Sequence, residues 1–237
     1  MTEEEWLDCN DATRSVCFVK RRASERRLRL LAAAWCRDIW PLLTDPRSRA
    51  VVETLESVAD GKAEFTQYEG VFRDAWSAWR ELAARPAPCG WAEEKRLPAE
   101  VHAARAAASL NWPIASAVGG VIVFAASAVK KASRSLRRPG RPEAKKYRLR
   151  QHRSIEEVFG DPFRRVSVER AWLAWNGGTV GEVAGAIYDE KRFEDTPILA
   201  DALEDAGCGD PAILDHLRSE RPHVRGCWVL DLLLGKS

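Results

Sequence analysis

The sequence predicts an all-α protein, and three observations support this fold class. Through most of the chain, apolar residues recur at steps of three or four, as they do on one face of a helix. Helix-start signals such as Thr44-Asp45-Pro46 and stop signals such as Asp60-Gly61 separate these stretches. In the C-terminal half, capped helices follow one another through short loops, which is typical of a small helical bundle.

The chain divides into four stretches of different character. We predict an N-terminal helical module at 1–111, an apolar helix at 112–129, a basic linker at 130–153 and a C-terminal helical bundle at 154–237. A chain of 237 residues suits one or two domains, each with a core of its own.

In the N-terminal module, Ser24 is the expected N-cap of a helix that continues to about Trp40. A second helix is expected after Pro46, where a proline follows a capping side chain. The third has the clearest pattern, an aromatic stripe at helical spacing: Phe65, Tyr68, Phe72, Trp76, Trp79 and Leu82. Such a stripe most often forms a core face, and the alternative is a groove for a ligand or a partner.

The C-terminal bundle is expected to begin with capping boxes at 154–157 (Ser-Ile-Glu-Glu) and 179–182 (Thr-Val-Gly-Glu). Thr196-Pro197 and Asp210-Pro211 mark two further helix starts. The last apolar segment, 227–234, is predicted to be the helix that closes the core, with a buried strand as the alternative.

The run at 112–129 carries no charged residue and is long enough to be a candidate membrane span. Gly119, Gly120 and several alanines dilute its hydrophobicity, and the acidic start MTEEEWL is not a signal peptide. We therefore expect a core helix and a cytoplasmic protein with reduced cysteines. The alternatives are a single span of the inner membrane at 112–129 and peripheral association with a membrane.

The basic segment 130–153 holds 11 Lys or Arg and 1 Asp or Glu, although the net charge of the chain is only +2. Such a block is usually solvated, but it also suits contact with nucleic acid, with an anionic membrane or with the acidic C-terminal half. Contact with nucleic acid would be weak and independent of base sequence. The candidate contact residues are Lys130, Lys131, Arg134, Arg137, Arg138, Arg141, Lys145 and Lys146.

No pattern in the sequence predicts a catalytic residue or a cofactor, and we expect no metal site. The candidates for one are Cys208, His216, His223 and Cys227, a set of thiols and imidazoles that zinc accepts. Their spacing argues against it, because only His223 and Cys227 form a close pair. Gly235-Lys236-Ser237 lacks the earlier glycine of a phosphate-binding loop.

Two blocks of the sequence carry a resemblance to known proteins. The first contains MTEEEWL and RLRLLAAAWCRDIW, and the second contains PILADALEDAGC and HVRGCWVLDLLLGK. Both blocks resemble a paralogous family of Gemmata-type planctomycete proteins. The resemblance implies a helical, alanine- and tryptophan-rich middle between the blocks. Because related proteins neighbour or carry leucine-rich repeats, it also implies protein interaction.

The leading hypothesis is therefore a non-enzymatic interaction or adaptor protein with a protein partner. It rests on the absence of a recognisable catalytic site and on acidic and basic blocks suited to docking. The alternatives are a single-span or peripheral membrane protein with a cytoplasmic basic tail, and a weak nucleic-acid binder that acts through residues 130–153.

Overall fold

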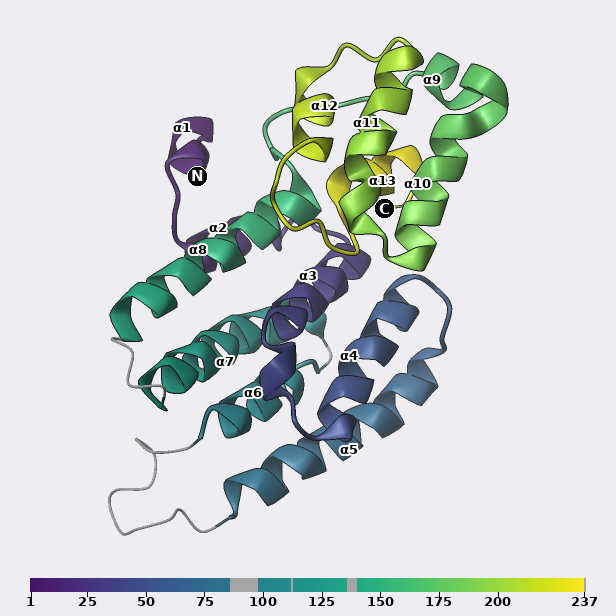
Figure 1. Ribbon diagram of the computed structural model, residues 1–237. Helices are drawn as coiled ribbons and strands as arrows, with labels where there is room; N and C mark the ends of the chain where they lie inside the picture. The colour runs from purple at the N-terminus through teal and green to yellow at the C-terminus, as the bar shows by residue number, and fades with distance from the viewer. Residues whose placement is uncertain (86–97, 112, 136–139, 237) are drawn as a thin grey trace. The chain divides into compact units, whose positions relative to one another are not determined.

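The computed structural model describes residues 1–85, 98–111, 113–135 and 140–236 and confirms the all-α prediction, because every regular element in these ranges is a helix. The chain forms two compact units, Met1–Ile155 and Glu156–Ser237. We call them the N-terminal unit and the C-terminal unit (Figure 1).

The N-terminal unit is built around α3 (Glu25–Asp38), which buries Leu31, Trp35 and Cys36 completely. The helix packs against α4, α6 and α7 (Figure 1). The remaining elements of this unit are α1 (Glu3–Leu7), α2 (Ala12–Val19), η1 (Trp40–Leu42), α4 (Pro46–Ala59), α5 (Phe65–Ala83), α6 (Ala99–Ala107), α7 (Ile114–Ser135) and most of α8 (Gly140–Phe159).

The predicted helix starts in this unit are confirmed where a capping side chain is present. The Ser24 hydroxyl accepts a hydrogen bond from the Arg27 N–H at the start of α3. The Asp45 carboxylate accepts one from the Arg47 N–H, and Pro46 opens α4. Each cap satisfies a backbone donor that has no partner within its own helix.

The segment predicted to be a basic linker, 130–153, is helical in its described part, because α7 runs to Ser135 and α8 begins at Gly140. Tyr147, Gln151 and Ile155 are buried at four-residue steps on one face of α8. Gln151 Nε2 donates to the Ile122 carbonyl of α7, and Trp35 Nε1 donates to the Gln151 carbonyl. This part of the segment is therefore a core element of the N-terminal unit.

The expected capping box at Ser154 does not form, because Ser154 lies inside α8. Its hydroxyl donates to the Arg150 carbonyl 3.1 Å away, one turn earlier. The expected box at Thr179 is also absent. Asn176, Gly177 and Gly178 all have positive φ before α10, and the Thr179 hydroxyl donates back to the Asn176 carbonyl.

The C-terminal unit is a small helical bundle, as predicted. Its core gathers Ile187, Leu199, Leu203, Leu217 and Leu230, all buried. The predicted last helix is confirmed as α13. The elements of this unit are the end of α8, α9 (Arg170–Ala174), η3 (Trp175–Gly178), α10 (Thr179–Glu190), η4 (Phe193–Asp195), α11 (Thr196–Asp205), α12 (Pro211–Leu217) and α13 (Trp228–Leu233).

Candidate functional sites

Four metal-ligating side chains meet inside the C-terminal unit, with their ligand atoms all within 4.8 Å of one another: Glu157, His216, His223 and Cys227. Glu157 lies near the end of α8, and His216 lies in the last turn of α12. His223 belongs to the loop that follows α12, and Cys227 is the N-cap residue of α13. We call this group the Glu-His-His-Cys cluster.

Each imidazole of the cluster points one nitrogen at both the carboxylate and the thiol. His216 Nε2 lies 3.2 Å from Cys227 Sγ and 3.4 Å from Glu157 Oε2. His223 Nδ1 lies 2.9 Å from Glu157 Oε1 and 3.9 Å from Cys227 Sγ. The ligand atoms of the four residues therefore converge within 4.8 Å of one another.

This convergence differs from the arrangement of a nucleophile–base–acid relay. In a relay, the histidine faces the nucleophile with one ring nitrogen and the orienting carboxylate with the other. In the cluster, the same nitrogen faces both groups on each ring. The geometry favours a shared central ligand over proton transfer along a chain.

The cluster is enclosed by protein. Side-chain exposure is 4% for Glu157, 3% for His223 and 14% for His216, and Cys227 is fully buried. The Trp228 ring packs on the His216 ring with centroids 5.2 Å apart. A substrate therefore has no open approach to the thiol.

Burial and charge act in opposite directions on the two acidic groups. Burial alone raises the pKa of the Glu157 carboxyl, but hydrogen bonds from His216 and His223 outweigh it and lower this pKa to about 2. Burial raises the pKa of the Cys227 thiol well above its usual value, and the Glu157 charge raises it further. With no cation present, Glu157 is therefore ionised at neutral pH and Cys227 is a thiol.

Three of the four residues named as metal candidates from the sequence belong to the cluster, and Cys208 does not. Cys208 is buried among the apolar residues of the bundle core instead. Sequence reasoning missed Glu157, which lies 59 residues before His216 and was expected to complete a capping box. The adjacent Glu156 pairs with Arg221 at 3.0 Å, so the local sequence does not distinguish the two glutamates.

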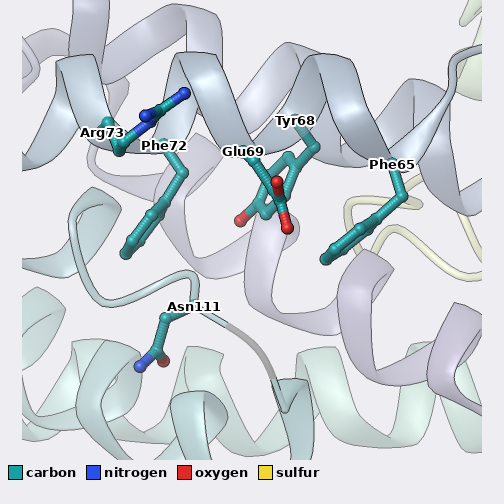
Figure 2. A pocket seen from close by; sticks show the side chains of 6 residues that line it. All are labelled: Phe65, Tyr68, Glu69, Phe72, Arg73 and Asn111. Carbon is teal, nitrogen blue, oxygen red and sulfur yellow. The ribbon is translucent and has the colours of Figure 1, made fainter.

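A second candidate site lies on α5 in the N-terminal unit, where a pocket of about 500 Å³ opens beside the helix. Figure 2 shows Phe65, Tyr68 and Phe72 projecting from α5 toward the segment that carries Asn111. The Tyr68 hydroxyl donates to the Leu110 carbonyl and so ties α5 to this segment. Glu69 and Arg73, one turn apart, complete the lining.

The aromatic stripe of α5 is only partly the core face that its spacing predicts. Tyr68 is buried, but Phe65 is 36% exposed and Trp76 is 45% exposed. The side of α5 that enters the core consists of Tyr68, Ala75 and Ala78. The helix therefore buries Tyr68 and two small residues and leaves other large aromatic side chains at or near the surface. We call these the aromatic face of α5 (Phe65, Phe72 and Trp76).

The structure shows only some of the candidate contact residues in the basic segment. Lys130 on α7 and Lys146 on α8 are exposed, and Lys131 is half-buried. The side chains of Arg134, Arg137, Arg138, Arg141 and Lys145 lie outside the described part of the structure. Binding of nucleic acid or anionic lipid through residues 130–153 stays a prediction.

Within the described ranges, one helix is long and apolar enough to cross a membrane, the stretch Ile114–Ser133 of α7, and 39% of its apolar window is buried. Its buried positions follow a helical stripe that includes Ile114, Val118, Val121 and Ala125. Length and composition alone are weak evidence for a span, because the core helix of a soluble protein has the same properties.

Comparison of the chain with protein-family models, with curated proteins and with solved structures finds no match. The resemblance to the planctomycete family stays a prediction.

Proposed function

We propose that the protein is a non-enzymatic adaptor that binds a partner protein through the aromatic face of α5. The observation that carries this proposal is the exposure of Phe65 and Trp76 on a helix whose residues Phe65 and Phe72 line a pocket of about 500 Å³. Aromatic side chains dominate the energetics of protein interfaces, and a pocket beside them can receive an anchoring side chain of the partner.

The spacing on α5 favours an amphipathic helix as the occupant. Phe65, Phe72 and Trp76 follow one another by seven and four residues, so they lie along one side of a 19-residue helix. A partner helix lying along this side would insert a bulky apolar residue into the pocket, as in helix-in-groove recognition. Glu69 and Arg73 would face polar residues at the edge of that helix.

The Glu-His-His-Cys cluster also supports a non-enzymatic role. Among the described residues, this cluster gathers a thiol, two imidazoles and a carboxylate, and its thiol group, Cys227, is fully buried. A catalytic thiol requires an accessible, electropositive environment that lowers its pKa. With no cation bound, burial and the Glu157 charge raise the pKa of Cys227 instead.

The adaptor proposal is tested with a phage library of amphipathic helical peptides selected against the full chain. We expect enriched peptides with a bulky apolar anchor, and an affinity at least about tenfold weaker for Phe65→Asp/Trp76→Asp than for wild type. Val123→Asp is the matched control, because Val123 is 54% exposed on α7 and does not line the pocket. No enrichment, or equal affinity for the double variant and wild type, would contradict the proposal.

A second candidate function is that of a single-span or peripheral membrane protein, and the observation that favours it is the length and apolarity of α7. The Gln151 hydrogen bond to the Ile122 carbonyl and the buried stripe of α7 support a core helix instead. Retention of the chain in a carbonate-washed membrane fraction separates the two functions.

A further inference from the structure

We propose that Glu157, His216, His223 and Cys227 bind one Zn²⁺ ion in a closed tetrahedral site. This inference does not depend on the adaptor proposal, because the four ligands lie in the C-terminal unit and the aromatic face of α5 lies in the N-terminal unit. Zinc is the metal of choice for such a set, because it accepts thiolate, imidazole and carboxylate ligands in tetrahedral geometry.

The separations between the imidazole nitrogens and the other two ligands lie within about 0.5 Å of the edges of a zinc tetrahedron. Bonds of about 2.0–2.1 Å to nitrogen or oxygen and 2.3 Å to sulfur place ligand atoms about 3.3 Å apart for nitrogen and oxygen and about 3.5 Å apart for nitrogen and sulfur. Each imidazole nitrogen lies near a different oxygen of the Glu157 carboxylate, His216 Nε2 at 3.4 Å from Oε2 and His223 Nδ1 at 2.9 Å from Oε1, so either oxygen can serve as the single ligand atom. The nitrogen–sulfur separations are 3.2 and 3.9 Å, on either side of the ideal edge.

The charges of the four ligands also suit a divalent cation. Glu157 contributes one negative charge, and Cys227 contributes a second when its thiol proton leaves to solvent on metal binding. The two imidazoles bind in their neutral form. A Zn²⁺ ion therefore makes the buried site neutral, which avoids the free-energy cost of an isolated charge away from water.

The site has the character of a structural rather than a catalytic centre. Four protein ligands fill a zinc tetrahedron, whereas catalytic sites keep one position for water or substrate. The ligands come from the end of α8, from the last turn of α12 and from the segment that leads into α13. The metal would hold these three parts of the C-terminal unit together.

The alternative is a metal-free network in which an imidazole pairs with the Glu157 carboxylate. That network explains the 2.9 Å contact between His223 and Glu157. It gives no reason for His216 Nε2 to lie close to both the Glu157 carboxylate and the Cys227 thiol. A metal-free network binds no zinc, so the two arrangements are distinguished by metal content.

The first test is the zinc content of the full chain, expressed and purified without a chelator and measured by mass spectrometry of the elements. We expect one zinc ion per chain in wild type and at least about tenfold less in Cys227→Ser and in Glu157→Gln. Cys208→Ser is the matched control, because Cys208 is also buried in the C-terminal unit but lies outside the cluster. This variant should keep its zinc.

A cobalt titration keeps the test decisive if the cluster variants do not fold. Wild-type protein is stripped with a chelator and titrated with Co²⁺. We expect the intense visible spectrum of tetrahedral Co²⁺, a thiolate-to-cobalt band in the near ultraviolet and saturation at one ion per chain. Zinc-free wild-type protein that also gives no such spectrum would overturn the proposal, as would loss of zinc in Cys208→Ser but not in Cys227→Ser.

Discussion

Gly160 turns the chain directly after α8 and has a φ of +63°, a conformation that favours glycine. A Cβ atom at this position would lie 3.1 Å from the Cγ and Cδ2 atoms of Trp228. Trp228 in turn packs on the His216 ring. The absence of a side chain at residue 160 thus lets α8 end against the residue that covers the Glu-His-His-Cys cluster.

We predict that Gly160→Ala lowers the free energy of unfolding by about 1–3 kcal/mol, because it combines an unfavourable φ with a close contact to an indole ring. Gly185→Ala is the matched control. Gly185 lies in the middle of α10, a Cβ there meets no atom within 4 Å, and alanine favours the helix by about 0.5–1 kcal/mol. Urea denaturation of both variants measures the difference, and equal stabilities would contradict this account of Gly160.

Three single residues show how far the sequence predicts the fold and the candidate metal site. Ser24 and Asp45 were predictable as caps, because each cap depends only on residues a few positions away. Glu157 was not predictable as a member of the cluster, because its partners His216 and Cys227 follow 59 and 70 residues later. Only the packing of α8 in the C-terminal unit brings the carboxylate to the imidazoles.

At the scale of elements, α6 and α7 pack closely through small side chains. Ala103, Ala106 and Ala107 of α6 are fully buried. A Cβ added at Gly120 of α7 would lie 3.2 Å from the Cβ atom of Ser109, which follows α6, whereas one added at the neighbouring Gly119 meets no atom within 4 Å. The two glycines of α7 therefore have different environments although they are adjacent in the sequence.

We predict that Gly120→Leu destabilises the protein by about 1–3 kcal/mol through overpacking. Gly119→Leu should be neutral or should stabilise it by up to about 1 kcal/mol, because leucine is a better helix former than glycine. The comparison is made by chemical denaturation. If α7 spanned a membrane apart from α6, both substitutions would raise the hydrophobicity of α7 alike. Equal effects of Gly120→Leu and Gly119→Leu on stability would therefore contradict the close packing of α7 against α6.

Two elements differ from what the sequence pattern favours, and each has a physical reason. The charges of 130–153 suggested a linker, but a helix with few apolar residues can still bury one face, and α8 does so with Tyr147, Gln151 and Ile155. The aromatic stripe of α5 suggested a core face. The core receives Tyr68 of the stripe together with Ala75 and Ala78, because helical spacing does not reveal which side of a helix meets its neighbours.

At the scale of the whole molecule, the charge of the chain is segregated: residues 130–153 are strongly basic, and residues 154–237 hold 16 Asp or Glu against 9 Lys or Arg. Helix α8 crosses from the basic stretch into the acidic one and links the two units. The sequence alone suggested that the C-terminal bundle begins at residue 154. In the structure, the N-terminal unit ends at Ile155 and the C-terminal unit begins at Glu156. The change in charge and in hydrophobic pattern is visible in the sequence, whereas the contacts inside each unit depend on packing.

We predict that the expressed protein stays in the supernatant when a membrane fraction is washed with carbonate. The reason is that α7 buries a stripe including Val118, Val121 and Ala125 and accepts a hydrogen bond from Gln151 at Ile122. An integral membrane protein of known topology serves as the control for the wash. Retention of the chain in the washed membrane would favour a span at Ile114–Ser133 instead.

X-ray absorption at the zinc K-edge of the full chain tests most directly whether a zinc ion organises the C-terminal unit, as we propose. We predict a first shell of four atoms, with one sulfur at about 2.3 Å and three nitrogen or oxygen atoms at about 2.0–2.1 Å from the zinc. A shell of five or six nitrogen and oxygen atoms without sulfur would contradict the claim, because it would place the ion away from Cys227.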